Sequence, residues 1–482
     1  MTMGFQLPPL LHVINGQRVA SRDGATLAVI DPSTEALMGQ VAHGSAADID
    51  AAVQAADAAR RGPWQELPPV QRGKLLFRLA DLVTREREAL AWLEACDVGK
   101  PISAARGDID GVAETLRYNA GAADKIEGAV IPLGERVVDY TRLEPLGVTA
   151  HVVPWNFPLG MVARSLAPAL AAGCTAVVKP AEQSPLSVLY FMDLVAEAGI
   201  PPGVVNVVCG DGPGAGAPLV AHPLVRGVAF TGSVEAGRAV GIAAAAGMKP
   251  AVLELGGKNA IIVAADADLD RLIEDVMMGG YENAGQVCSS SSRLLVARSV
   301  AGEVAERLAA RAAALRVGEA LSDPDLGPVV SAEQHAKVMG YLDGARAGGA
   351  RLITGGGRPA GLPRGYFVAP TVFDNTDPAS RIAQEEVFGP VVTITPYDTD
   401  QQALDIANSV STGLVAGVYT RDLNRAFAMV AALETGSVWV NGWYLGGTQA
   451  PTGGTKDSGL GRERGLIAVR NFLRIKNVAF RL

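Results

Sequence analysis

Three side chains stand in local sequences that suit them to nucleophilic chemistry at a carbonyl group. Cys288 follows Gly-Gln-Val on an expected turn, and a cysteine thiolate near a helix end or hydrogen-bond donors is a strong nucleophile. Glu254 ends an expected strand just before Leu-Gly-Gly, where its carboxylate could take a proton from water. Asn156 lies between Pro154 and Pro158, which fix the backbone around it, so its amide could donate to an oxyanion.

Each of these residues also has an ordinary structural explanation when it is considered alone. A single cysteine is more often a small buried residue, a glutamate at a strand end is normally on the surface, and an asparagine often forms a turn. The other cysteines lie in apolar or helical contexts and are expected to be structural: Cys96, Cys174 and Cys209. Because no CxxC pair or Cys/His cluster has zinc spacing, neither a disulfide framework nor a metal site is expected.

Two glycine-containing segments could approach a phosphate group. The sequence Phe230-Thr231-Gly232-Ser233 joins an expected strand to an expected helix, so backbone N–H groups, the helix N-terminus and two hydroxyls could face a pyrophosphate. Considered alone, it suits an ordinary helix N-cap equally well. Residues 212–217 fit G-x-G-x-x-A, but no acidic residue follows at the expected distance, so a turn into a helix is the better interpretation.

The elements that must position these residues alternate regularly from Gly147 onward. Short apolar strands alternate with helices, which predicts a parallel sheet covered on both faces, with ligands at the carboxyl ends of its strands. The expected strands are 148–153, 175–179, 204–208, 225–230 and 251–254, and the expected helices are 161–172, 185–198, 213–221 and 234–246. A second alternation predicts strands 260–263 and 293–297 and helices 268–283 and 300–316.

The two ends of the chain have different patterns. The first ~120 residues predict a short β-rich entry followed by helices, one of which opens with a capping box from Ser45 to Asp48. Residues 471–482 alternate apolar and polar side chains, as an exposed or intersubunit strand does. An edge strand of this kind needs covering, so a homodimer or homotetramer is expected.

Length and charge limit the classes of function. A chain of 482 residues predicts two or three domains, and 49% apolar with 19% charged residues predicts a globular protein. The net charge of −8 and the scattered basic residues argue against a nucleic-acid surface. We expect no membrane span, no secretory signal and, from the few unpaired cysteines, a cytoplasmic location with a small-molecule partner.

Together, the motifs resemble those of the aldehyde dehydrogenase superfamily. Their order and spacing agree over nearly the whole chain: PWNFP at 154–158, KPAEQSP at 179–185, FTGS at 230–233, ELGGK at 254–258, GQVCSS at 285–290, EEVFGPV at 385–391 and SGLGRE at 458–463. The implied fold class is α/β, with a doubly wound Rossmann-type cofactor domain, an α/β catalytic domain and a small β oligomerisation element. We expect the cofactor domain to comprise residues 1–123 and 146–255 and the catalytic domain residues 256–455. The oligomerisation element is expected at 124–145 and 469–482.

The resemblance also implies a role for each matching residue. Cys288 would attack an aldehyde, Asn156 and the Cys288 N–H would hold the oxyanion, and Glu254 would activate the water that hydrolyses the thioester to an acid. The implied cofactor is NAD, because a carboxylate at Glu182 would repel the 2′-phosphate of NADP. Use of NADP stays possible, since this is a preference only. Lys179 and Glu182 would hold the adenosine ribose, and the other implied cofactor residues are Pro154, Trp155, Thr231, Gly232, Ser233, Leu255, Glu386 and Phe388.

The departures from the family pattern concern the substrate pocket, to which we also assign Phe157. Arg164 matches an arginine that helps succinate-semialdehyde dehydrogenases hold a carboxylate, but Glu282 stands where those enzymes have a second arginine. If both line the pocket, they could pair and leave it near neutral; otherwise Arg164 points away. Trp443 and Tyr444 could wall a pocket for an aromatic or medium aliphatic aldehyde.

Other functions remain compatible with these motifs. They are a semialdehyde dehydrogenase that uses Arg164, a coenzyme-A-acylating enzyme in which a thiol takes the acyl group, and a non-catalytic, crystallin-like protein that has kept the fold. The presence of Cys288, Glu254 and Asn156 argues against the last, and Glu254 favours hydrolysis over transfer to a thiol.

Overall fold

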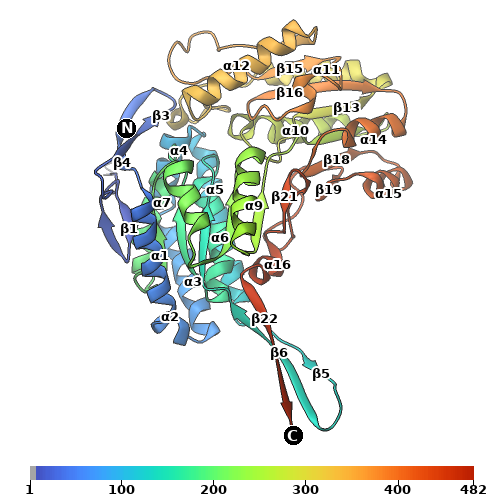
Figure 1. The fold of residues 1–482 in the computed structure, drawn as a ribbon. Coiled ribbons are helices and arrows are strands. Elements are labelled where there is room, and N and C mark those ends of the chain that lie inside the picture. Colours follow the sequence, from blue (N-terminus) through green and yellow to red (C-terminus); the bar gives the residue numbers. More distant parts are fainter. Residues whose placement is uncertain (1–6) are drawn as a thin grey trace.

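Two helix-covered sheets organise residues 7–482, the part of the chain that the computed structural model describes (Figure 1). Residues 1–6, which begin the segment where no secretory signal is expected, lie outside this part. A three-stranded arm projects from one end of the body (Figure 1). The mixed α/β architecture with two largely parallel sheets is the predicted fold class.

The first sheet is parallel in its centre and antiparallel at its edges. Its strands, in spatial order, are β2 (Gln17–Val19), β1 (His12–Ile14), β9 (Val205–Val207), β8 (Thr175–Lys179), β7 (Val148–Val152), β10 (Val225–Thr231), β11 (Ala251–Glu254) and β21 (Gly459–Leu460). From β7 the chain runs outward through β8 and β9, then returns to place β10 on the other side of β7. The segments after β7 and β10 therefore flank a switch point, where ligands bind in such sheets.

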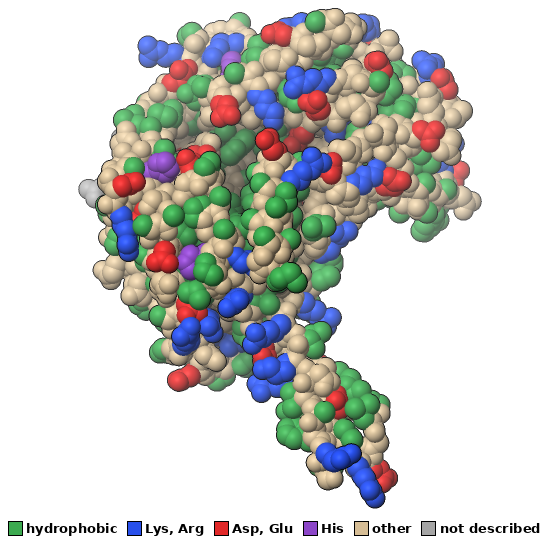
Figure 2. Space-filling model, viewed as in Figure 1, with side chains coloured by type: hydrophobic (Ala, Val, Ile, Leu, Met, Phe, Trp, Pro, Cys, Tyr) green, Lys and Arg blue, Asp and Glu red, His purple; other side chains and the backbone are tan. Residues whose placement is uncertain are grey.

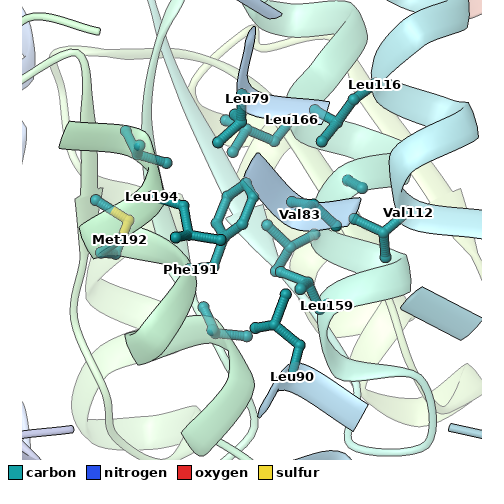
Figure 3. Packing of buried hydrophobic residues seen from close by; sticks show 14 of the residues in the cluster. Leu79, Val83, Leu90, Val112, Leu116, Leu159, Leu166, Phe191, Met192 and Leu194 are labelled. Atoms are coloured by element: carbon teal, nitrogen blue, oxygen red, sulfur yellow. The ribbon is translucent and has the colours of Figure 1, made fainter. Parts of the chain in front are cut away.

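Helices cover both faces of this sheet because its buried strands have two apolar faces. In β8, for example, Val177 packs against the helices on one face of the sheet, and its neighbours Ala176 and Val178 pack against the helices on the opposite face. One face carries α1 (Ala46–Arg60), α8 (Ala217–Ala221) and α9 (Val234–Ala246). The other carries α3 (Pro69–Arg85), α4 (Arg87–Val98), α5 (Ile102–Ala122), α6 (Pro158–Ala172) and α7 (Leu186–Glu197), whose interlocking side chains Figure 3 shows.

The second sheet has six parallel strands and one antiparallel edge strand. Its order is β14 (Arg351–Thr354), β15 (Thr371–Asp374), β16 (Val391–Tyr397), β13 (Arg293–Ala297), β12 (Ala260–Val263), β18 (Val415–Tyr419) and β19 (Ser437–Val440). Helices α10 (Leu269–Tyr281), α11 (Arg298–Ala313) and α12 (Ala332–Ala347) pack on one face, and α14 (Asp400–Asn408) and α15 (Leu423–Ala432) pack on the other.

The arm consists of β5 (Val130–Ile131), β6 (Val137–Pro145) and the C-terminal β22 (Leu473–Arg481), which follows α16 (Gly465–Arg470). Strands β6 and β22 pair along their whole length. The arm leaves apolar side chains in solvent, including Val130, Ile475 and Phe480, and Figure 2 shows hydrophobic side chains on its surface together with charged ones at its tip.

Most predicted elements occur within a few residues of their expected positions, and the differences have local causes. The helix predicted at 161–172 begins at Pro158, whose fixed φ suits the first turn. The helix predicted at 268–283 ends at Tyr281, because the backbone at Asn283 and Ala284 is left-handed. The capping box is confirmed, since the Asp48 carboxylate accepts from the Ser45 N–H at 2.9 Å. Residues 212–216 form one π-helical turn that leads into α8, in agreement with the predicted turn into a helix. None of the described helices is long and apolar enough to cross a bilayer.

Candidate active site

A cavity of about 590 Å³ lies between the two sheets and gathers most of the predicted site residues. The first sheet contributes segments that follow its strands, whereas Cys288 and Glu386 precede β13 and β16 in the second sheet. The predicted residues that line this cavity are Pro154, Trp155, Asn156, Phe157, Arg164, Thr231, Gly232, Ser233, Glu254, Leu255, Glu282, Cys288, Glu386, Phe388 and Tyr444. Lys179, Glu182 and Trp443 lie outside its lining.

An unusual backbone turn presents Cys288 to the cavity. Asn283, Ala284 and Gly285 all have positive φ, of 48°, 56° and 71°, so the chain reverses directly after α10. At Gly285 a Cβ atom would collide with the Gly389 carbonyl, so only glycine fits there. The Gln286 side chain holds the turn, donating to the Asn283 carbonyl at 2.9 Å and accepting from the Val330 N–H.

Two reciprocal hydrogen bonds fasten Asn156 to this turn. The Asn156 Nδ2 donates to the Gln286 carbonyl at 2.8 Å, and the Asn283 Nδ2 donates to the Asn156 carbonyl at 2.9 Å. Asn156 is only 5% exposed, so its amide is held in one place. The predicted oxyanion donor thus lies beside the turn that carries the predicted nucleophile.

Glu254 ends β11 as predicted, and its side chain is buried against the cavity. Burial, reinforced by the nearby carboxylate of Glu463, raises the pKa of Glu254 to about 8, although Arg164 acts in the opposite direction. Its buried Oε1 atom has no hydrogen-bond partner among the described residues. This carboxyl group therefore exchanges its proton near neutral pH, as a general base must.

Arg164 extends from α6 to two carboxylates. Its guanidinium forms an ion pair with Glu463, and its Nη2 lies 3.7 Å from Glu254 Oε2. Burial disfavours its charge, but Glu463 and Glu254 outweigh burial and raise the pKa of Arg164. The ion pair between Arg164 and Glu282 that the sequence suggested does not form. Both residues line the cavity, but Arg164 is paired with Glu463 and Glu254.

Cys288 is a neutral thiol in this environment. Burial raises its pKa to about 11, Arg164 lowers it, and Glu386 and Glu254 raise it further. A base must therefore remove the thiol proton before attack, and Glu254 is the lining carboxyl group whose charge acts on both Cys288 and Arg164.

The turn from β10 to α9 lines the cavity with Thr231, Gly232 and Ser233. The Ser233 hydroxyl caps α9 by accepting from the Ala236 N–H at 3.2 Å, so the N-terminus of this helix begins at the cavity wall. At Gly232 a Cβ atom would lie 2.6 Å from the Phe230 ring, so glycine lets the chain pack closely against that ring at the cavity edge.

Glu386 projects into the same cavity from the second sheet. Its Oε1 accepts from the Gly257 N–H at 3.0 Å, and burial raises its pKa to about 7. Phe388 meets Trp155 edge to face, with ring centroids 5.2 Å apart. The other two predicted cofactor residues lie together at the end of β8, where Lys179 Nζ donates to the Gly210 carbonyl at 3.0 Å and lies 3.4 Å from Glu182.

The aromatic wall of the cavity differs in one member from the expectation. Tyr444 lines the cavity, but Trp443 is 3% exposed and lies behind the wall. The tryptophan that lines the cavity is Trp439. Trp439 contacts Trp443 edge to face at 4.7 Å and Tyr444 at 5.8 Å. All four residues of β19 are half-buried, and Trp443 and Tyr444 lie in the loop after it, so no sequence pattern indicates which of these aromatic side chains faces the cavity.

Sequence reasoning also missed several polar neighbours of the site. Glu463 lies within the quoted SGLGRE motif, and the polar residues around Cys288 were a signal that could have identified Asn283 and Gln286. Nothing local indicates the charged network behind Phe157, where Lys100 Nζ lies 2.5 Å from Asp108 and 4.3 Å from the Phe157 ring centroid.

Comparisons with known proteins identify the family to which this chain belongs. The family model for the aldehyde dehydrogenase family matches residues 19–478. Retinaldehyde dehydrogenase 3 of Mus musculus is 44% identical, covering 97% of this chain and 92% of the relative, and mitochondrial aldehyde dehydrogenase of Homo sapiens is 44% identical, covering 95% and 89%. The NAD+ complex of aldehyde dehydrogenase from Bacillus cereus has a TM-score of 0.96 at 41% identity, covering 99% of this chain and 97% of that one. The chain belongs to the aldehyde dehydrogenase family and is an oxidoreductase that oxidises aldehydes.

Proposed function

We propose that this enzyme oxidises an uncharged aldehyde to the carboxylic acid through a thioester on Cys288, with NAD as hydride acceptor. The observation that supports this most is the convergence of Cys288, Asn156 and Glu254 from two sheets on one cavity. NAD fits the residues present, and the Bacillus cereus relative binds it. The β10–α9 turn would hold the pyrophosphate, Glu386 the nicotinamide ribose, and Lys179 with Glu182 the adenosine ribose.

The first step would form a bond between Cys288 and the substrate. Glu254 takes the proton from the Cys288 thiol, and the sulfur attacks the carbonyl carbon. The carbonyl oxygen becomes an oxyanion, held by the Cys288 N–H and by Asn156 Nδ2, whose resting partner is the Gln286 carbonyl. Asn156 thus exchanges a neutral acceptor for a charged one, which favours the transition state.

The second step would release the acid. Bound NAD would supply the hydride acceptor, and loss of hydride from the carbon attached to sulfur would leave a thioester on Cys288. Glu254 then releases the thiol proton to solvent and takes a proton from water. The resulting hydroxide attacks the thioester carbon, and the Cys288 sulfur leaves as a thiolate that takes a proton back from Glu254. Product analysis with and without coenzyme A tests the acceptor, and an acyl-coenzyme A product would contradict hydrolysis.

The substrate class follows from the use of Arg164. Because its guanidinium is already paired with Glu463 and Glu254, a substrate carboxylate would have to compete with two buried acids. We therefore propose that Arg164 positions the general base. The aromatic wall of Phe157, Trp439 and Tyr444 favours an aromatic or medium aliphatic aldehyde.

A semialdehyde dehydrogenase is the second candidate, because Arg164 does line the cavity. An NADH-release screen over benzaldehyde, hexanal and succinate semialdehyde separates the two. We expect kcat/KM to be highest for one of the uncharged aldehydes. A clear preference for succinate semialdehyde would contradict the role given to Arg164.

Three further proposals concern the arm, the domain boundaries and the cellular location. The exposed apolar side chains of β22 and β5 support a homodimer or homotetramer in which residues 124–145 and 469–482 are covered by another subunit. Residues 1–123 with 146–255 would form the cofactor domain and 256–455 the catalytic domain. All four cysteines are free, which supports a reducing, cytoplasmic location.

A further inference from the structure

A second cavity, of about 770 Å³, lies where the arm joins the body and shares no lining residue with the active-site cavity. Figure 2 shows Lys and Arg side chains gathered at this place. The lining has one carboxylate, Glu144, against six cations: Arg60, Arg72, Arg142, Arg226, Arg474 and Lys476. Such a concentration of positive charge stands out on a chain of net charge −8.

Half of these cations lack a carboxylate partner. Glu144 binds both Arg474 and Lys476 in the arm, and Arg60 pairs with Asp57 at 2.7 Å. No ion pair to Arg72, Arg142 or Arg226 occurs among residues 7–482. Like charges brought together in this way repel one another unless an anion lies between them.

Arg72 makes the strongest case for an anion. It is 8% exposed, donates to the Leu67 carbonyl at 2.8 Å, and its buried Nε has no partner among the described residues. Burial lowers the pKa of Arg72, and no carboxylate offsets that cost. A buried guanidinium without a counter-ion is costly in a folded protein.

Two glycines with positive φ let three of the arginines converge. A Cβ atom on Gly147 would lie 3.5 Å from the Arg226 side chain and 3.7 Å from that of Arg60, and one on Gly173 would lie 3.2 Å from Arg72 Cζ. Both glycines adjoin the starts of the paired strands β7 and β8. The cations therefore reach a common floor of backbone from α1, α3 and β10.

We propose that this cavity binds a multivalent oxyanion between Arg60, Arg72 and Arg226, with Arg142 at its rim. Guanidinium groups bind phosphate and carboxylate oxygens in this way, through paired N–H donors. The oxyanion belongs to a free phosphate-bearing molecule, because a phosphate group presents several acceptor oxygens and more than one negative charge to the three guanidinium groups. By bridging the arm and the body, it fixes the direction in which the arm projects.

The test is a calorimetric titration of pyrophosphate into the full-length enzyme, with saturating NAD present to fill the β10–α9 turn. We compare the wild type with the double variant Arg60→Gln/Arg226→Gln, in which Asp57 keeps its partner Arg61. The matched control is Arg421→Gln, an exposed arginine whose side chain has no ion pair within the described chain. We expect saturable binding that is at least ~10-fold weaker in the double variant and unchanged in the control.

Light scattering on the same samples shows whether these arginines instead hold subunits together. If pyrophosphate does not bind and only the double variant loses subunits, a carboxylate of a second copy occupies the site and the proposal is overturned. Equal pyrophosphate affinity in all three proteins overturns the proposal. So does the absence of binding together with an unchanged oligomeric state.

Discussion

The two cavities of this enzyme both contain arginines but use them in opposite ways. In the active site, Arg164 is paired with Glu463 and lies close to Glu254, so its charge is satisfied within the chain. In the basic cavity, Arg72, Arg142 and Arg226 have no carboxylate partner in residues 7–482. An arginine in a pocket is therefore not evidence for an anionic ligand until the partners that the fold already supplies have been identified.

The largest expected effect is at the nucleophile. Cys288→Ala should lower aldehyde-dependent NADH formation by about 10⁴-fold or more, because no other side chain in the cavity can form the thioester. A melting temperature close to that of the wild type is the control for folding. Near-normal turnover in this variant would refute the mechanism.

Glu254→Gln should separate the two chemical steps. Glutamine cannot accept a proton, so steady-state turnover should fall by about 10²–10⁴-fold. If acylation retains another route for the thiol proton, stopped-flow absorbance will show one NADH per active site before the rate falls. If both steps need Glu254, no burst of NADH will appear. Turnover equal to that of the wild type would exclude Glu254 as the base.

Asn156→Ala should lower kcat by about 10²–10³-fold by removing one oxyanion donor. The backbone carbonyl that accepts from Asn283 is retained in this variant, so the turn before Cys288 should keep its shape. An effect confined to KM would show that Asn156 serves substrate binding instead.

The pairing of Arg164 should be visible in the pH profile. The pKa of Glu254, about 8, predicts that kcat/KM for benzaldehyde rises with pH up to that point, because only the carboxylate is a base. Arg164→Met removes a cation and should move the midpoint to higher pH, and the rate at neutral pH should then fall roughly tenfold for each pH unit that the midpoint moves. Glu463→Gln removes a competing negative charge and should move the midpoint to lower pH.

Arg164→Lys serves as the conservative control, since it restores a cation and should return the midpoint toward that of the wild type. If Arg164 instead holds a substrate carboxylate, Arg164→Met will raise KM for succinate semialdehyde. In that case the midpoint measured with benzaldehyde will not move.

The smallest expected effect is that of salt on the active site. Raising NaCl from about 0.05 to about 0.5 M should leave the pH midpoint for benzaldehyde nearly unchanged, because the Arg164 ion pairs are buried. The same change should weaken pyrophosphate binding at the basic cavity, whose rim is open to solvent. Equal sensitivity in both measurements would remove the distinction between the two cavities.

The regular part of the fold could be predicted because its signals are local. Strands β11, β12 and β13 and helix α9 have the predicted bounds, since each is a short apolar run or an amphipathic segment between glycines, prolines or caps. The positions of Cys288, Glu254 and Asn156 around one cavity could be expected only from the family resemblance, because their own sequence contexts are compatible with structural roles.

The partners of charged residues could not be predicted. Arg164 and Glu463 lie far apart in the sequence and meet because α6 packs beside the segment that follows β21. The positions of Trp439 and Trp443 could not be predicted, because Trp443 lies in the loop after β19 and the course of that loop is set by packing against the rest of the domain. Both cases depend on tertiary packing that no local pattern encodes.

The clasp between Asn156 and the Asn283–Gln286 turn has a consequence for how the enzyme matures. Each partner belongs to a different sheet, so neither half of the chain contains the catalytic arrangement before the two have docked. Activity during refolding should therefore appear only after secondary structure has formed in both halves, at the rate of the final docking event. A nascent chain in which the first-sheet strands up to β11 have folded would still be inactive toward aldehydes.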